Sequence, residues 1–383
     1  MNALATGHED LIHDIAYDHY GRLLATCSSD QYIKLFTRVS PSADWSLLSS
    51  FKAHDANIFS LSFALPQYGL LLASCSEDQT VRVHRSIDDG RTFVKIATLS
   101  DSSGPVHQVA FTKFGGHGLK LACIGTDGVV RVYHAADPTD LRQWHLAFEK
   151  VVDKAGLLAN GVAAAKDLQG DFAIDWCPSG TVRAPWFTSN LDSAMDDSEL
   201  PRVDRLTIEE LAVEQFVASS MSKVFVFRKR LNGGIYEYER TEELPGHTDI
   251  VRDVAWASNA GVGGRYELIA TASRDGWVRI FKLTTRRIGE PTAEYRNGAA
   301  GTVSLNEDKG DDYDEFAYDV ELLDQFDHHK SEVWKVSWNV AGTILSSSGD
   351  DGRVRFWRAA YTGKFVGVGV ASAEQIPQDE VDE

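Results

Sequence analysis

The sequence predicts an all-β fold built from six copies of one small sheet unit. Two observations lead to this prediction: a hairpin pattern recurs at a regular period, and a strand of the same kind precedes each hairpin. In the hairpin, a short apolar strand leads into a tight turn with an aspartate, and an alternating strand follows. The turn aspartates are Asp30, Asp78, Asp127, Asp275 and Asp351. The first three follow one another at intervals of 48 and 49 residues, which is enough for about four short strands and their turns.

The strand before each hairpin is marked by a polar residue and, nine residues later, an aromatic residue. Clear copies span residues 8–17, 54–63, 102–111, 247–256 and 329–338. A weaker copy spans 167–176, and we assign its hairpin to the strands that begin at Gln215 and Lys223, without a turn aspartate. The six units are therefore expected at about 8–53, 54–101, 102–166, 167–246, 247–327 and 328–370, within one domain that spans 1–370.

Composition and charge narrow the functional classes. The chain has 383 residues, of which 43% are hydrophobic, so it can form a large packed core. Its formal net charge of -18 repels phosphate groups and anionic lipid heads, and no apolar run approaches the roughly 20 residues that span a bilayer. We therefore expect no direct nucleic-acid ligand and no membrane insertion. The acidic insertion at 307–319, the acidic tail at 371–383 and the long loop at 178–211 are expected at the surface, with an electrostatic docking strip as the alternative for the acidic stretches.

Catalytic motifs are missing from the sequence. The patterns G-x-S-x-G, the P-loop, H-E-x-x-H and G-x-G-x-x-G after a strand do not occur. His328 and His329 are adjacent, so on a strand their side chains would point to opposite faces rather than to one metal ion. We expect no enzyme activity, no cofactor and no metal site.

The repeat resembles the WD repeat, whose units each form a four-stranded blade of a β-propeller. In that family a histidine before the first strand, a serine or threonine on the second, the turn aspartate and a tryptophan on the third form a hydrogen-bonded tetrad. The resemblance implies structural tetrads of His329, Ser347, Asp351 and Trp357; of His8, Thr26 and Asp30; of His54, Ser74 and Asp78; and of His247, Thr271 and Asp275. Phe36 and Phe281 replace the tryptophan in the first and fifth units, so we expect incomplete tetrads there.

The ends of the repeat predict an open ring. A closed propeller usually places an N-terminal strand in its last blade, but only seven residues precede His8, and the last unit has its own candidate outer strand at 363–370. Exposed apolar faces on the first and last blades indicate that a partner contributes a seventh blade in trans. A closed six-bladed ring is the alternative. The expected partner interface comprises Leu11, Ile12, Ile15, Ile33, Leu35, Val333, Val336, Val354, Phe356 and Phe365.

Three segments strengthen a family resemblance: HEDLIHDIAYDHYGRLLATCSSDQYIKLF, DLRQWHL from Asp140, and FDHHKSEVWKVSWNVAGTILSSSGDDGRVRFW. They resemble the small WD-repeat nucleoporins of the Y-shaped nuclear pore scaffold, which are paralogues of the WD-repeat subunit of the COPII outer coat. The resemblance implies an open six-bladed propeller that accepts a blade from a helical scaffold nucleoporin, contacts with other Y-complex subunits, and a place in the nuclear pore complex at the nuclear envelope.

The same resemblance implies support for nucleocytoplasmic transport of protein and mRNA. It also implies a second role in the vacuolar or lysosomal complex that regulates nutrient signalling through the TOR kinase, at the membrane surface. Two alternatives stay open: a COPII-type coat subunit and a substrate-receptor propeller. The receptor alternative is the weaker one, because the innermost-strand positions Asp14, Ser60, Gln108, Asp253 and Lys335 give no basic ring.

Overall fold

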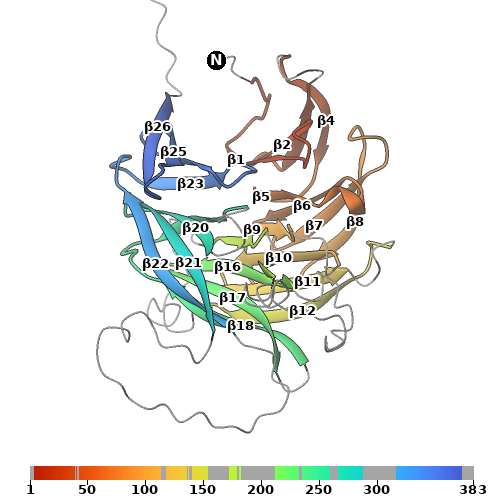
Figure 1. Cartoon of the computed structure of the whole chain (residues 1–383). Helices are drawn as coiled ribbons and strands as arrows, with labels where there is room; N and C mark the ends of the chain where they lie inside the picture. Colours follow the sequence, from red (N-terminus) through yellow and green to blue (C-terminus); the bar gives the residue numbers. More distant parts are fainter. Residues whose placement is uncertain are drawn as a thin grey trace, which may run out of the picture.

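The computed structural model describes residues 4–38, 40, 43–113, 118–135, 137, 140–153, 172–178, 181–182, 212–232, 235–258, 266–287 and 316–372. The expectations for residues 183–211, 307–315 and 373–383 lie outside these ranges. Strands of the described residues form six four-stranded antiparallel sheets, arranged as the blades of a propeller (Figure 1). The strands of each blade pair in chain order.

The first blade contains β1 (Ile12–Tyr17), β2 (Leu23–Ser28), β3 (Tyr32–Thr37) and β4 (Ser46–Lys52). The second contains β5 (Ile58–Phe63), β6 (Leu71–Ser76), β7 (Val81–Ser86) and β8 (Phe93–Leu99), with a 3-10 turn at Pro66–Tyr68. The third contains β9 (Val106–Phe111), β10 (Lys120–Gly125), β11 (Val129–Ala135) and β12 (Trp144–Val151).

The fourth blade contains β13 (Ile174–Trp176), β16 (Gln215–Ser220), β17 (Lys223–Asn232) and β18 (Ile235–Leu244), and a short pair, β14 (Thr181–Val182) and β15 (Ala212–Val213), lies between β13 and β16 in the chain. The fifth contains β19 (Val251–Trp256), β20 (Tyr266–Ser273), β21 (Val278–Arg287) and β22 (Phe316–Phe326). The sixth contains β23 (Val333–Trp338), β24 (Ile344–Gly349), β25 (Arg353–Ala359) and β26 (Phe365–Ser372).

The hairpin turn explains why the same short motif recurs. The residue after each turn aspartate has a left-handed backbone: φ is 73° at Gln31, 67° at Gln79 and 66° at Gly352. The turn serine or glycine and the aspartate hold this geometry, as where Asp78 N–H donates to Ser76 Oγ at 3.1 Å. Side chains along the strands on either side alternate between the two faces of the blade, so that a blade can bury apolar side chains against a neighbour on each face.

The core is divided into five apolar clusters, one between each pair of successive blades. Ala25, Cys27, Ile33 and Leu35 of the first blade pack against Ile58, Leu61 and Leu72 of the second. Corresponding clusters join the second blade to the third, the third to the fourth, the fourth to the fifth and the fifth to the sixth. Within the described residues no such cluster joins the sixth blade to the first.

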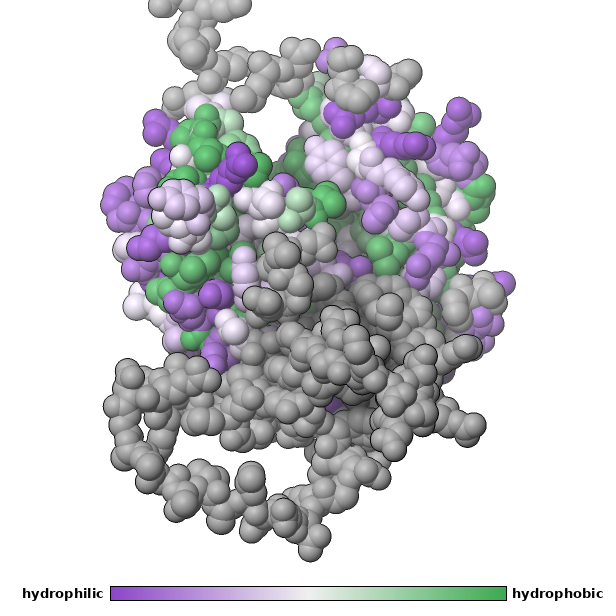
Figure 2. All heavy atoms as spheres, in the orientation of Figure 1, coloured by the Kyte–Doolittle hydropathy of each residue, from purple (hydrophilic) through white to green (hydrophobic). Residues whose placement is uncertain are grey.

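An opening separates the sixth blade from the first. In Figure 1, β23, β25 and β26 lie on one side of this opening and β1, β2 and β4 on the other. The space-filling view shows that side chains do not fill it (Figure 2). The predicted all-β, six-bladed, open propeller is therefore confirmed, and the opening is hereafter called the gap.

Candidate functional site

Two apolar positions of the innermost strand are buried in later blades but exposed in the first. Ile12 is 40% exposed, whereas Ile58 at the same position of the second blade is 0% exposed. Ile15 is 55% exposed, whereas its equivalent Leu61 is 5% exposed. The buried equivalents of Ile12 are Ile58, Val106, Val251 and Val333, and those of Ile15 are Leu61, Val109, Ile174, Val254 and Val336. These positions face the preceding blade, and no blade precedes the first one.

The sixth blade lacks the matching cover on its opposite face. In the four earlier blades that have a turn aspartate, the third and fifth residues after it are buried against the following blade, as Ile33 and Leu35 are. Val354 and Phe356 occupy these positions in the sixth blade, and both are only partly buried. Val366 and Val368 of the neighbouring strand are exposed. The apolar face that would meet a following blade is therefore uncovered.

Exposed apolar side chains concentrate on the blades that border the gap. Among the described residues, thirteen of the seventeen large apolar side chains that are exposed belong to the first and sixth blades or their connecting turns. Green apolar atoms line both sides of the gap in Figure 2. Single exposed apolar residues are ordinary, but a concentration of this kind marks a surface for another polypeptide.

The structure corrects half of the predicted interface. Ile33 and Leu35 pack against the second blade, and Val333, Val336 and Phe365 pack in the cluster between the fifth and sixth blades, so none of these five faces the gap. A given repeat position points in the same rotational direction in every blade, so one position cannot face the gap from both sides. Ile12, Ile15, Val354 and Phe356 do border the gap, and Leu11 is exposed just before β1.

Lys335 reaches from the sixth blade to the first. Its Nζ lies 3.4 Å from Asp14 Oδ1 and 3.8 Å from Asp253 Oδ2. Loss of hydration opposes the charged form, but these two carboxylates raise the pKa of Lys335, so the ammonium group stays charged. Burial raises the pKa of Asp253 to about 6. The ion pair joins the innermost strands only, and the apolar faces behind it remain uncovered.

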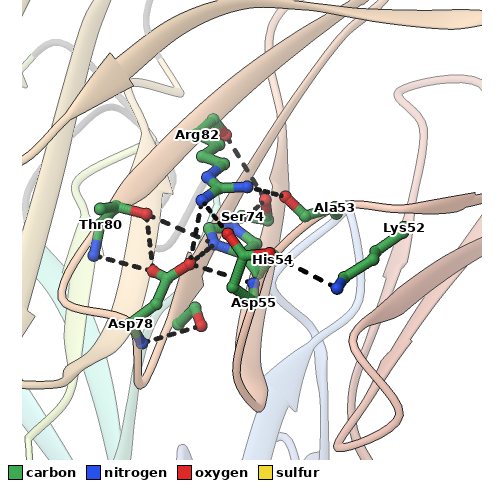
Figure 3. Close-up of polar contacts among 9 residues, drawn as sticks. Lys52, Ala53, His54, Asp55, Ser74, Asp78, Thr80 and Arg82 are labelled. Carbon is green, nitrogen blue, oxygen red and sulfur yellow. Dashed lines mark hydrogen bonds and ion pairs between the residues drawn. The ribbon is translucent and has the colours of Figure 1, made fainter.

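The histidine site of the second blade, around His54, is drawn in Figure 3. His54 Nδ1 lies 2.9 Å from Asp78 Oδ2, and His54 Nε2 lies 2.8 Å from Ser74 Oγ. Burial lowers the pKa of His54 despite the carboxylate, so the neutral ring donates Nδ1–H to Asp78 and accepts from the serine hydroxyl. Burial also opposes ionisation of Asp78, but hydrogen bonds from His54 and Thr80 hold its pKa far below the ordinary value. The site fixes the turn to the blade.

The other predicted tetrad residues form the same contacts. In the sixth blade His329 lies 2.8 Å from both Asp351 Oδ1 and Ser347 Oγ, and Trp357 Nε1–H donates to Ser347 Oγ at 3.0 Å. His8 lies 2.7 Å from Asp30 and 2.8 Å from Thr26, and His247 lies 3.1 Å from Asp275 and 2.7 Å from Thr271. Phe36 and Phe281 supply no indole N–H, so these two sites lack the fourth member.

Sequence reasoning missed a basic residue in these sites. Four positions after the turn aspartate, an arginine forms an ion pair with that aspartate in four blades. The pairs are Arg82–Asp78 at 3.2 Å, Arg131–Asp127 at 2.8 Å, Arg279–Asp275 at 2.9 Å and Arg355–Asp351 at 2.5 Å. The signal was present, because all five hairpins have a basic residue at this position; Lys34 of the first blade donates instead to the Gly7 carbonyl.

We predict that Asp78→Ala lowers the free energy of unfolding by about 3 kcal/mol, because it leaves the buried His54 without its carboxylate and removes one ion-pair partner of the partly buried Arg82. Urea unfolding at pH 7 measures the change. Glu77→Ala in the same turn is the matched control and should cost less than about 0.5 kcal/mol. Equal losses in the two variants would contradict a structural role for the aspartate.

Buried histidines make stability depend on pH. Burial lowers the pKa of His84 to about 3 and that of His107 to about 4, and it also lowers the pKa of His54, His247 and His329. An unfolded imidazole binds its proton below about pH 6.5, whereas these folded rings bind it only at lower pH. The contribution of these neutral histidines to the free energy of unfolding is therefore fully present above about pH 6.5 and is lost as pH falls toward their folded pKa values.

We predict that the free energy of unfolding drops between pH 7 and pH 5, by up to about 2 kcal/mol for His107 alone. Asp253 has a raised pKa and therefore stabilises the fold as pH falls, but it is a single group and offsets only part of this loss. The His107→Phe variant keeps the ring between Phe59 and Phe172 without a titratable nitrogen, so its pH dependence in urea unfolding should be shallower. An unchanged pH dependence would refute the assignment.

The described part of the chain has few groups suited to metal binding or catalysis. No cluster of three or more His, Cys, Asp or Glu residues there is arranged to hold a metal ion. Cys27, Cys75, Cys123 and Cys177 are buried and form no disulfide with one another, and burial raises the pKa of Cys123 to about 12, so that thiol is unreactive. Among the described residues, no helix has the length and hydrophobicity needed to span a membrane.

Comparisons with known proteins agree with the propeller geometry. A family model for the WD domain, G-beta repeat, matches residues 2–37, 45–85, 238–282 and 320–358. A chain in the crystal structure of a mitotic checkpoint complex superimposes with a TM-score of 0.54 at 15% sequence identity, covering 91% of this chain and 74% of that one. At that identity the likeness shows the fold alone.

Curated relatives are far more similar in sequence. The chain is 37% identical to Nucleoporin SEH1 of Saccharomyces cerevisiae, covering 98% of this chain and 100% of that protein. It is 33% identical to Nucleoporin seh1 of Schizosaccharomyces pombe, with 98% and 97% covered, and 33% identical to Nucleoporin SEH1 of Homo sapiens, with 98% and 89% covered. The resemblance to WD-repeat nucleoporins is thereby confirmed, and these relatives are structural proteins rather than enzymes. The chain belongs to the nucleoporin SEH1 family of WD-repeat proteins.

Proposed function

We propose that this chain is a scaffold subunit of the nuclear pore that accepts a β-blade from a helical nucleoporin into the gap. The single observation that supports this most strongly is the exposure of repeat positions that are buried everywhere else: Ile15 at one side of the gap and Phe356 at the other. Both sides thus present the surface that an adjacent blade covers elsewhere in the ring. The proposal combines this surface with membership of a nucleoporin family.

The function that follows is mechanical. An inserted blade would bury apolar area on both of its faces and would extend the ring to seven blades. A partner held on two sides is fixed in orientation, which is what a scaffold subunit needs. As a member of the Y complex in the nuclear envelope, the chain would then support pore assembly and nucleocytoplasmic transport of protein and mRNA.

Other functions have less support. A substrate-receptor propeller would present unpaired basic or aromatic groups at the channel, but Lys335 is paired with Asp14 and Asp253. A COPII-type coat subunit would share the gap and differ only in its partner. A role in TOR-linked nutrient signalling would use the same propeller in a second assembly, and no contact among the described residues favours it.

Affinity isolation of the tagged chain from cell extract at moderate salt tests the proposal. Mass spectrometry identifies the partners and their stoichiometry. We expect a helical nucleoporin at one copy per chain, accompanied by other Y-complex subunits; nutrient-signalling subunits in the eluate would add the second assembly. Recovery of a COPII outer-coat partner in place of nucleoporins, or of no stoichiometric partner, would overturn the proposal.

A further inference from the structure

A hydrogen bond between innermost strands closes every junction of successive blades. In each case a side-chain oxygen of one blade accepts a main-chain N–H of the next blade. The five bonds are Leu61 N–H to Asp14 Oδ2 (3.0 Å), Phe111 N–H to Ser62 Oγ (3.0 Å), Ile174 N–H to Gln108 Oε1 (2.7 Å), Trp256 N–H to Asp175 Oδ2 (2.8 Å) and Val336 N–H to Asp253 Oδ2 (3.1 Å). We call these contacts the strand relay.

The acceptors of the strand relay occupy only two repeat positions, two residues apart. Asp14, Gln108 and Asp253 hold the earlier position, and Ser62 and Asp175 hold the later one. The acceptor therefore alternates from blade to blade, beginning with the earlier position. The next acceptor in this order would be at the later position of the sixth blade.

That position in the sixth blade is Ser337. The earlier position is Lys335, whose ammonium group has only donors and cannot accept an N–H. Ser337 pairs with Ser346, which pairs in turn with Phe356. Ser62 holds the corresponding place in the second blade, where it lies beside Ala73 and faces the third blade. Ser337 is exposed and therefore presents its hydroxyl on the gap side of the sixth blade.

The first blade supplies the opposite half of the contact. The N–H groups used elsewhere in the strand relay belong to the positions of Leu61 and Phe111, and their equivalents in β1 are Ile15 and Tyr17. These N–H groups lie on the edge of β1 that does not pair with β2, because the equivalent groups in later blades point away from their own sheet. An inserted strand that carries an acceptor side chain could bond to either.

We infer that the innermost strand of the inserted blade continues the strand relay: its main-chain N–H donates to Ser337 Oγ, and its own oxygen-bearing side chain accepts the N–H of Ile15 or Tyr17. The inference rests on the proposed function and specifies the partner segment. That segment runs in the same direction as β1 and β23 and has an aspartate, asparagine, glutamine or serine among apolar residues. It is not a purely apolar wedge.

Substitutions at Ser337 separate this inference from simple apolar burial. Ser337→Ala should weaken the affinity for the helical nucleoporin recovered with the chain by about tenfold, because the inserted N–H would lose its acceptor. Ser337→Asp should preserve the affinity, because aspartate is the acceptor at three of the five existing junctions and Lys335 lies two residues away. If binding depended on apolar burial alone, Ser337→Ala would bind more tightly than Ser337→Asp.

Ser346 provides the matched control. It pairs with Ser337 on the neighbouring strand of the same blade, and its hydroxyl donates to the main-chain carbonyl of Ser337 at 3.0 Å, so it is not an acceptor of the strand relay. We expect Ser346→Ala to bind like the wild type and Ser346→Asp to bind weakly, because its carboxylate would be buried without a partner. Titrations of the purified wild-type and variant chains with the nucleoporin measure the affinities, and thermal melting confirms that each variant is folded.

The outcomes distinguish the two levels of the proposal. If the wild-type chain forms no complex, the proposed function fails. If it does form the complex but Ser337→Ala binds like the wild type, or Ser337→Asp binds as weakly as Ser346→Asp, the continued strand relay is wrong while the proposed function stands.

Discussion

We expect the double variant Ile15→Asp and Phe356→Asp to lose its helical nucleoporin partner while it remains folded. The two side chains lie on opposite sides of the gap, and an inserted blade would cover both. Each aspartate would then have to lose its hydration against an apolar surface, which costs several kcal/mol for an unpaired charge. A weakening of about 1,000-fold or more is expected from the pair. In the free chain the cost is small, because Ile15 is exposed and Phe356 is only partly buried.

Ile87→Asp is the matched control. Ile87 follows the third strand of the second blade and is 69% exposed, a little more than Ile15, but it lies in a different blade. This variant should bind the nucleoporin as the wild type does. Co-purification at wild-type stoichiometry by the double variant, with its melting temperature unchanged, would remove the gap from the binding mechanism.

The second large effect is expected from Leu35→Asp. Leu35 is fully buried between the first and second blades, among Ile33, Ile58 and Leu61. A carboxylate in this cluster has no partner, so we expect a loss of roughly 5 kcal/mol or more, comparable with the whole stability of an ordinary domain. Urea unfolding followed by circular dichroism should show a protein that is largely unfolded, or one whose first blade has detached.

Leu35→Ala serves as the graded control for this variant, with an expected loss of about 2–5 kcal/mol from the cavity. Together with Ile15→Asp, the variant separates two surfaces of the same blade: one change destroys the fold and the other destroys only the interface. A Leu35→Asp chain with wild-type unfolding but no partner would instead place Leu35 at the gap.

The repeat made most of the architecture predictable. Because each hairpin has its turn aspartate in the same register, the resemblance to the WD repeat could be applied blade by blade, and it implied that residues such as His329, Ser347 and Asp351 lie together. The direction in which a repeat position faces was also contained in the sequence, since Leu35 and Phe356 hold the same register. Equivalent positions turn the same way around a ring, so only one of the two could border the gap.

Other features depend on contacts between distant segments and left no local signal. Glu214, for example, binds both Lys120 of the third blade and Lys229 of the fourth, and Tyr238 O–H donates to it at 2.9 Å. Burial at this site lowers the pKa of Lys120 to about 8, although the carboxylate opposes the shift. The strand relay is similar, because each bond joins residues from different repeats whose spacing becomes meaningful only in the assembled ring.

Hydrogen exchange of β1 tests the central claim most directly. The Ile12–Tyr17 strand forms the edge of the gap, and its outward N–H groups are predicted to have no covering strand in the free chain. We predict that the outward amides of β1, at Ile15 and Tyr17, exchange rapidly in the isolated protein, and that the one bonded by the inserted strand becomes strongly protected in the complex with the helical nucleoporin. Equal exchange of both amides with and without the bound partner would show that the partner does not enter the gap.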